Sequence, residues 1–210
     1  NRRTLQVCVS RLQCMANCLW HKKQGGTIMN YYIADTHFDH KNIIAFDNRP
    51  FFTLTEMNNT LIENWNNKVS KTDTVFILGD FCWSKEDRWI EILSQLQGSK
   101  VLTLKHKFQD IVAYKEITDN GRKVIMSHYP IPFYKSDYNN KVYHLYGHVH
   151  NTVEEKYLQE LKQQILKTDI RETGRHTGQY FNCWCGFYNY TPVRLDEILD
   201  KWKDKEQSSQ

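Results

Sequence analysis

The sequence predicts an α/β protein, and three observations lead to that class. Apolar runs of strand length recur along the chain and end in an aspartate or a histidine, as residues 74–80 do. Residues 55–69 carry apolar side chains four positions apart, which is typical of an amphipathic helix that covers a sheet. Asp119-Asn120-Gly121-Arg122, between two further runs, favours a β-hairpin. Two sheets packed face to face with helices outside, an α/β/β/α sandwich, would accommodate these elements.

The elements are expected in the following order. Strands are predicted at residues 31–34, 74–78, 100–104, 114–118, 123–127, 142–146 and 180–185. Helices are predicted at residues 55–69, 85–96, 154–167 and 195–205. Trp89, Leu93 and Leu96 form the apolar stripe of the second helix, and Tyr157, Leu161 and Ile165 form that of the third. Alternation of strands and helices in the first half implies parallel pairing with right-handed crossovers.

The chain divides into a leader (residues 1–28), one domain (residues 29–202) and a tail expected to fray (residues 203–210). The leader lacks periodicity and holds five of the 28 basic side chains and none of the 24 acidic ones. Residues 29–210 therefore carry 23 basic against 24 acidic side chains and are nearly neutral, so the charge does not indicate a nucleic-acid partner, although a local basic patch is compatible with it.

Two features of the leader allow an interpretation. Cys14, Cys18 and His21 have zinc-like spacing but offer only three ligands, so free cysteines are the preferred interpretation. Residues 23–29 can be back-translated into a purine-rich stretch just before an ATG codon, which resembles a bacterial ribosome-binding site. Our hypothesis is that translation begins at Met29; an intact mass that includes Asn1 to Ile28, measured on protein from the native locus, would contradict it.

The residues that end the apolar runs are those that bind divalent cations. Asp35-Thr36-His37 alone is equally compatible with a turn in which Asp35 caps a backbone N–H. The pattern recurs, however, with Gly79-Asp80, His106, His128 and Gly147-His148-Val149-His150 at the ends of later runs. Functional groups of layered α/β proteins gather at the carboxyl ends of strands, so we expect these side chains to form one metal-binding constellation.

In this order, Asp-x-His, Gly-Asp, a strand ending in histidine, His-x-Pro and Gly-His-x-His resemble the calcineurin-like metallophosphoesterase superfamily. The resemblance covers Met29 to about Leu199, and residues 35–44 resemble a small microbial and phage branch. It implies the four-layer α/β/β/α sandwich of the metallophosphoesterase type. It also implies a hydrolase that cleaves a phosphomonoester or phosphodiester by attack of a metal-bridging hydroxide.

The resemblance further implies the site residues and the cofactors. Asp35, His37 and His150 would hold one metal ion, and His128 and His148 a second, with Asp80 bridging the two. His106 would act as the catalytic residue that protonates the leaving alkoxide or neutralises developing charge. Two divalent metal ions are expected, manganese first, with iron, zinc or nickel as alternatives.

One motif departs from the family. Where relatives have Gly-Asn-His-Asp, this chain has Leu104-Lys105-His106-Lys107, so a lysine replaces the asparagine that ligates the second metal. An ammonium group has no lone pair to donate. Three outcomes are open: a weakened two-metal esterase, a protein with one metal and no turnover, or replacement of the ligand by Gln109 or Asp110.

Two rival functions follow from these observations. The first is a catalytically impaired metal-binding member of the same fold, which Lys105 favours. The second is a nuclease, since nucleic acids are phosphodiesters, although the near-neutral domain counts against it. The expected partner is a phosphoester substrate, and no membrane partner is expected because no apolar run is long enough to span a bilayer. Cys82, Cys183 and Cys185 are expected to be free thiols in a reducing cytoplasm.

Overall fold

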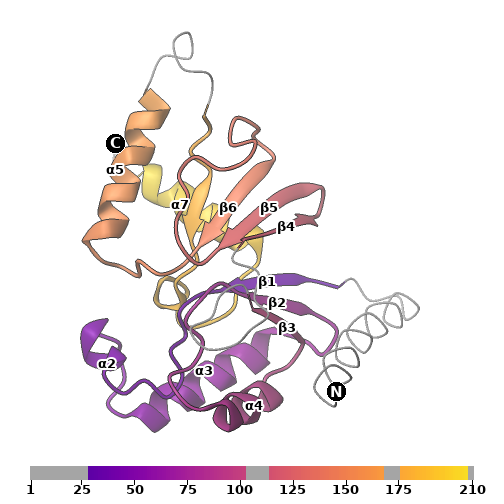
Figure 1. Ribbon diagram of the computed structural model, residues 1–210, viewed down its shortest axis with the longest axis vertical. Helices are drawn as coiled ribbons and strands as arrows, with labels where there is room; N and C mark the ends of the chain where they lie inside the picture. The colour runs from indigo at the N-terminus through magenta and orange to yellow at the C-terminus, as the bar shows by residue number, and fades with distance from the viewer. Residues whose placement is uncertain (1–27, 103–113, 168–175, 208–210) are drawn as a thin grey trace, which may run out of the picture.

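The computed structural model describes residues 28–102, 114–167 and 176–207, and the predicted α/β class is confirmed (Figure 1). Of the predicted leader, residues 1–27, including Cys14, Cys18 and His21, lie outside the described residues. The strands are β1 (Asn30–Ile33), β2 (Thr74–Ile77), β3 (Ser99–Leu102), β4 (Tyr114–Asp119), β5 (Arg122–Ser127), β6 (Val142–Tyr146) and β7 (Tyr180–Asn182). The helices are α2 (Ile43–Phe46), α3 (Leu54–Lys68), α4 (Glu86–Gln95), α5 (Val153–Lys167) and α7 (Leu195–Gln207), with a 3₁₀ turn at Cys185–Tyr188.

The first sheet has the order β1-β2-β3, and its strands are parallel, as expected. Helices α3 and α4 connect these strands and lie together on one side of the sheet (Figure 1). Helix α3 begins at a capping box, in which the Thr53 side chain accepts from the Glu56 backbone N–H and Glu56 reaches back to the Thr53 N–H. This box fixes where the helix starts, and with it the direction of the chain that returns to β2.

The second sheet has the order β4-β5-β6-β7. Strands β4 and β5 form the predicted antiparallel hairpin, and Asn120 and Gly121 take positive φ angles of 48° and 76° at its turn. Strands β5, β6 and β7 are parallel to one another. The carboxyl ends of β5 and β6 therefore lie side by side, as those of β1 and β2 do in the first sheet.

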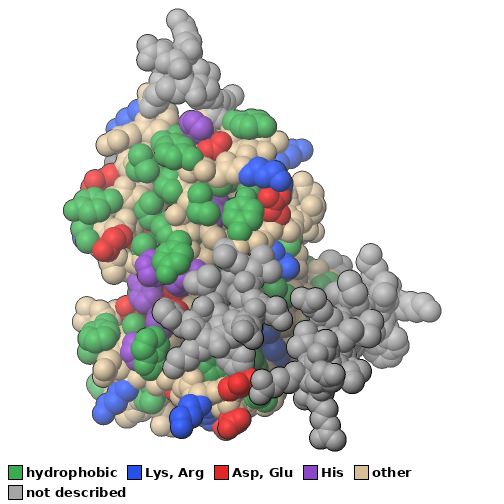
Figure 2. Space-filling model, in the orientation of Figure 1, with side chains coloured by type: hydrophobic (Ala, Val, Ile, Leu, Met, Phe, Trp, Pro, Cys, Tyr) green, Lys and Arg blue, Asp and Glu red, His purple; other side chains and the backbone are tan. Residues whose placement is uncertain are grey.

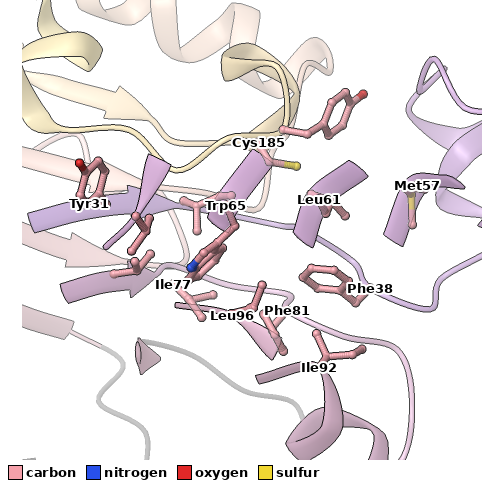
Figure 3. Packing of buried hydrophobic residues seen from close by; sticks show 14 of the residues in the cluster. Tyr31, Phe38, Met57, Leu61, Trp65, Ile77, Phe81, Ile92, Leu96 and Cys185 are labelled. Carbon is pink, nitrogen blue, oxygen red and sulfur yellow. The ribbon is translucent and has the colours of Figure 1, made fainter. Parts of the chain in front are cut away.

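Three apolar clusters hold these elements together. The first joins the first sheet to α3 and α4 and is centred on Trp65, whose indole N–H donates to the Gln97 carbonyl at 2.9 Å (Figure 3). The second lies between the sheets and combines β1 and β2 with β5, β6 and β7 and with α7. The third packs β5, β6 and β7 against side chains of α5, Leu158 and Ile165.

Four details differ from the predictions. The fully buried side chain of α4 is Ile92, outside the predicted stripe, whereas Trp89 and Leu93 are only partly buried. In α5, Tyr157 is 62% exposed. The last strand ends at Asn182, because the chain turns there into the 3₁₀ segment. Helix α7 continues to Gln207, through part of the predicted tail. None of the described helices combines the length and apolar character needed to cross a lipid bilayer.

Candidate metal centre

The site lies where β1, β2, β5 and β6 end. Four of the predicted metal ligands have positive φ angles, namely Asp35 at 54°, His37 at 52°, His148 at 71° and His150 at 44°. Such angles are uncommon for residues with a side chain and concentrate at functional sites. Backbone hydrogen bonds hold the loops in these conformations, including His37 N–H to the Asp80 carbonyl at 3.0 Å and Gly147 N–H to the His128 carbonyl at 2.9 Å.

Asp35 is at the centre of the site and is completely buried. Its Oδ2 accepts a hydrogen bond from the backbone N–H of His148 at 2.8 Å. Its Oδ1 is also buried and has no hydrogen-bond partner among the residues that the structure describes. Burial raises the pKa of Asp35, although His150 and His128 act in the opposite direction. A buried carboxylate oxygen without a donor has the environment that a bound cation would satisfy.

Two glycines allow the strand ends to approach Asp35. A Cβ added at Gly79 would lie 1.9 Å from Nδ1 of His128 and 2.7 Å from Oδ1 of Asp35. A Cβ added at Gly147 would lie 2.6 Å from both Oδ2 of Asp35 and the Cβ of Ala34. Any larger residue at either position would displace a predicted ligand. The glycines of Gly-Asp and Gly-His-x-His are therefore part of the site geometry.

Asp35, His37 and His150 form one compact group of ligand atoms. Nε2 of His37 lies 3.3 Å from Nε2 of His150, and the latter lies 3.9 Å from Oδ2 of Asp35. Burial, with the nearby His150 and Arg49, lowers the pKa of His37 to about 2, so this imidazole is neutral at ordinary pH. Neutral imidazole is the form that binds a metal ion.

Asp35 belongs to a second compact group as well, together with Asp80 and His128. Asp80 also approaches the first group, since its Oδ2 lies 3.9 Å from Nε2 of His37. His148 is outside both compact groups, but its Nδ1 lies 3.2 Å from Nε2 of His128. Burial and the neighbouring His128 lower the pKa of His148. The structure thus brings all six predicted metal ligands to one place.

Hydrogen bonds to Nδ1 of two imidazoles determine which of the two ring nitrogens carries the proton. Nδ1 of His128 lies 3.0 Å from the Leu78 carbonyl, and Nδ1 of His150 lies 2.7 Å from Oδ1 of Asp47. A carbonyl and a carboxylate only accept, so each Nδ1 must carry the proton. In the neutral ring, Nε2 of both histidines then has a lone pair, and each Nε2 lies beside another predicted ligand, His148 at 3.2 Å from His128 and His37 at 3.3 Å from His150.

Asp47 and Arg49 were not predicted from the sequence. Arg49 is 4% exposed and donates to Oδ2 of Asp47 through Nε at 3.1 Å and Nη2 at 2.9 Å. It also donates to the carbonyls of Thr36 at 2.8 Å and Asp35 at 3.0 Å. Burial would lower the pKa of His150, but the hydrogen bond to Asp47 and the charge of Asp35 outweigh burial and raise it. The sequence signal for this pair is only a charge pair two residues apart, which is common in loops.

Other parts of the prediction fall outside the described residues. These are His106, the predicted catalytic residue, and Lys105, Gln109 and Asp110. Figure 2 shows histidine side chains gathered at the seam between the parts that carry the two sheets, with hydrophobic side chains on both sides. The histidines of the centre are contributed by both parts.

Comparisons with known proteins found a sequence relative and a structure of similar fold. No family model matches the chain. It is 33% identical over 171 residues to the uncharacterised protein MJ1445 of Methanocaldococcus jannaschii, an alignment that covers 80% of this chain and 88% of that protein. Its fold is similar to the crystal structure of AQ665 from Aquifex aeolicus, a protein of unknown function, with a TM-score of 0.53 and 21% identity over 83% of this chain and 99% of that one.

Proposed function

This chain belongs to the same family as protein MJ1445 of Methanocaldococcus jannaschii, and we propose that it is a metal-dependent phosphoesterase of the calcineurin-like metallophosphoesterase superfamily. The observation that carries the proposal is the buried Oδ1 of Asp35, which lies 3.5 Å from Nδ1 of His128, accepts no hydrogen bond from the described residues and belongs to the carboxylate that both ligand groups share. Oxygen and imidazole ligands around a shared carboxylate suit a pair of divalent cations.

The donor set of the site fits such ions. Asp35 and Asp80 offer oxygen ligands, and His37 offers an imidazole that is neutral at ordinary pH. His128 and His150 present Nε2 lone pairs because their Nδ1 protons are engaged by Leu78 and Asp47. Manganese is our first choice for both positions, with iron, zinc or nickel as alternatives. When bound, the ions would supply positive charge to the oxygens of a phosphoester and make a nearby water more acidic.

The finer fold assignment is part of the same proposal. Helices α3 and α4, the first sheet, the second sheet and α5 follow one another through the three apolar clusters. This succession supports the four-layer α/β/β/α sandwich of the metallophosphoesterase type. In that arrangement the ends of β1 and β2 face those of β5 and β6 across the seam, which is where the ligand groups lie (Figure 1).

The chain's own residues have distinct roles in this proposal. Gly79 and Gly147 let the backbone approach Asp35 closely. Asp47 orients the ring of His150, and the Leu78 carbonyl orients that of His128. His148 is exposed, so the substrate would enter on its side of the site. His106 stays our prediction for the group that transfers a proton to the leaving oxygen.

Metal content and hydrolysis test the proposal together. The purified protein is loaded with manganese and desalted, metal per chain is measured by elemental analysis, and hydrolysis of p-nitrophenyl phosphate and bis(p-nitrophenyl) phosphate is followed. We expect about two metals per chain and turnover, and loss of both in Asp35→Asn. Asp137→Asn is the matched control, because Asp137 is also buried but pairs with His176 away from the centre. Two bound metals without hydrolysis of either ester would contradict the proposal.

Lys105 is the reason to include one more variant. If the wild type holds one metal and is inactive, and Lys105→Asn restores the second metal and turnover, the chain is an impaired metal-binding member of the fold. Salt-dependent binding of oligonucleotides would instead favour the nuclease, against which the near-neutral charge of residues 29–210 counts.

Cys82, Cys183 and Cys185 are free thiols, which supports our proposal of a reducing, cytoplasmic location.

A further inference from the structure

Exposed aromatic side chains stand next to the candidate metal centre. Trp83 is 61% exposed, Phe46 is 72% exposed and Tyr129 is 52% exposed. Isolated exposed apolar residues are common on proteins and need no explanation. These three differ because each contacts a histidine at or beside the centre. Aromatic rings that border a phosphate-binding site can contact the organic part of the substrate.

Trp83 is connected to the first ligand group through His40. Its ring stacks on that of His40, with centroids 4.6 Å apart and an angle of 19° between the planes. The His40 ring in turn lies 5.3 Å from that of His37. Phe46 meets the edge of His40 at 6.3 Å and helps to hold it in place. Trp83 is therefore a largely exposed ring that packs on His40, and His40 in turn packs against the predicted metal ligand His37.

Tyr129 borders the other side of the centre. Its ring centroid lies 4.4 Å from that of His148 and 4.9 Å from that of His128. Tyr129 follows β5 and Trp83 follows β2, so the two rings approach the site from different sheets. A substrate whose phosphate is at the centre would thus have an aromatic surface near each ligand group.

We propose that the centre takes a nucleotide, with the phosphate at the metal ligands and the base stacked on the exposed part of Trp83. This inference rests on the proposed function for its phosphate position. A nucleobase is favoured over an aliphatic group because Trp83 already stacks on His40, so its other face is a flat aromatic surface on which a base can stack as the third ring. A mononucleotide is favoured over a polymer because residues 29–210 are nearly neutral, so a long phosphate backbone has no matching charge.

The test compares AMP with ribose 5-phosphate, which carries the same phosphate without the base. Binding of each to the manganese-loaded protein is measured by isothermal titration calorimetry, so that the result does not depend on turnover. Base stacking on an aromatic side chain corresponds to roughly a 5- to 150-fold gain in affinity. We expect AMP to bind more tightly than ribose 5-phosphate within this range, and the ratio to fall towards one in Trp83→Leu.

Tyr138→Leu is the matched control, since Tyr138 is 65% exposed and, among the described residues, has no ring contact with a histidine of the centre. Its AMP preference should equal that of the wild type. Equal affinity for the two compounds in the wild type, or a preference that Trp83→Leu leaves intact, would overturn the inference. A protein that prefers AMP through Trp83 but hydrolyses no ester would retain the stacking site and contradict only the proposed function.

Discussion

Replacing Asp47 by asparagine tests whether this buried carboxylate positions a metal ligand. Asp47 accepts from Nδ1 of His150 at 2.7 Å through one oxygen and from Arg49 at 2.9 and 3.1 Å through the other. Both partners are donors, so the asparagine NH₂ group must face one of them with no acceptor to offer. Asp47→Asn keeps the shape of the side chain while removing its charge and one of its two acceptor positions.

The expected cost follows from these contacts. Loss of a partner on the far side of a metal-ligating histidine reduces metal affinity roughly 10- to 100-fold, or about 1.4–2.8 kcal/mol. Alanine would be a less informative change. It would leave the buried guanidinium of Arg49 without its carboxylate, which costs about 3–5 kcal/mol of stability and would obscure an effect on the metal.

Competition with a fluorescent chelator measures the manganese affinity, and urea unfolding without metal measures stability. The control is Asp137→Asn, in which another histidine, His176, loses a carboxylate partner at 2.8 Å away from the centre. We expect Asp47→Asn, but not Asp137→Asn, to bind manganese more weakly, because the affected metal position is the one that includes His150. Affinity within about twofold of the wild type, or an equal decrease in both variants, would refute a positioning role for Asp47.

Three further changes probe the site and the fold. Gly79→Ala should displace His128 and reduce the metal content, because the new Cβ would lie 1.9 Å from its Nδ1. Gly121→Asn is the control and should leave the metal content unchanged, since a Cβ at Gly121 would have no atom within 4 Å. Full metal content in Gly79→Ala would contradict this account. Burial lowers the pKa of His144 from 6.5 to about 4, so the unfolded chain binds a proton that the folded chain does not, and stability is lost as pH falls from 6.5 towards 4. Between pH 7 and pH 5 the loss should be about 2 kcal/mol larger in the wild type than in His144→Gln by urea unfolding, and equal losses would exclude this origin. Thr53→Ala should lower the unfolding free energy by about 1 kcal/mol through loss of the α3 cap, whereas Thr55→Ala, two residues further along the same helix, should change it little; equal effects would show that the capping box is not the cause.

The fold class could be predicted because local patterns agree with the tertiary structure over most of the chain. The turn chemistry of Asn120-Gly121 and the capping residues before α3 act over a few positions, so the sequence shows them directly. Which residues of a helix are buried is harder to predict, because it depends on the elements that cover each of its faces. Ile92 is buried in α4 and Tyr157 is exposed in α5, although both predicted stripes had the correct helical period.

That the six predicted metal ligands lie together could be predicted for a related reason. Each lies within about four residues of the end of a strand, and the ends of parallel strands meet at one edge of a sheet, so chain order carries spatial information. Asp35 and Asp80 follow the paired strands β1 and β2, while His128 and His148 follow the paired strands β5 and β6. That the aspartate pair and the histidine pair face each other across the seam depends on how the two sheets pack. The spacing of residues in the sequence gives no information on that packing.

Asp47 and Arg49 show where this reasoning stops. They lie just beyond the short helix α2, in a segment with no strand period, and Asp47 contacts His150 across 103 positions of sequence. What places them is the burial of Arg49 against the carbonyls of Asp35 and Thr36, whose orientation depends on the positive φ of Asp35. The loop conformation of a predicted ligand thus positions a charge pair, and supporting residues of this kind leave no local pattern in the sequence from which to predict them.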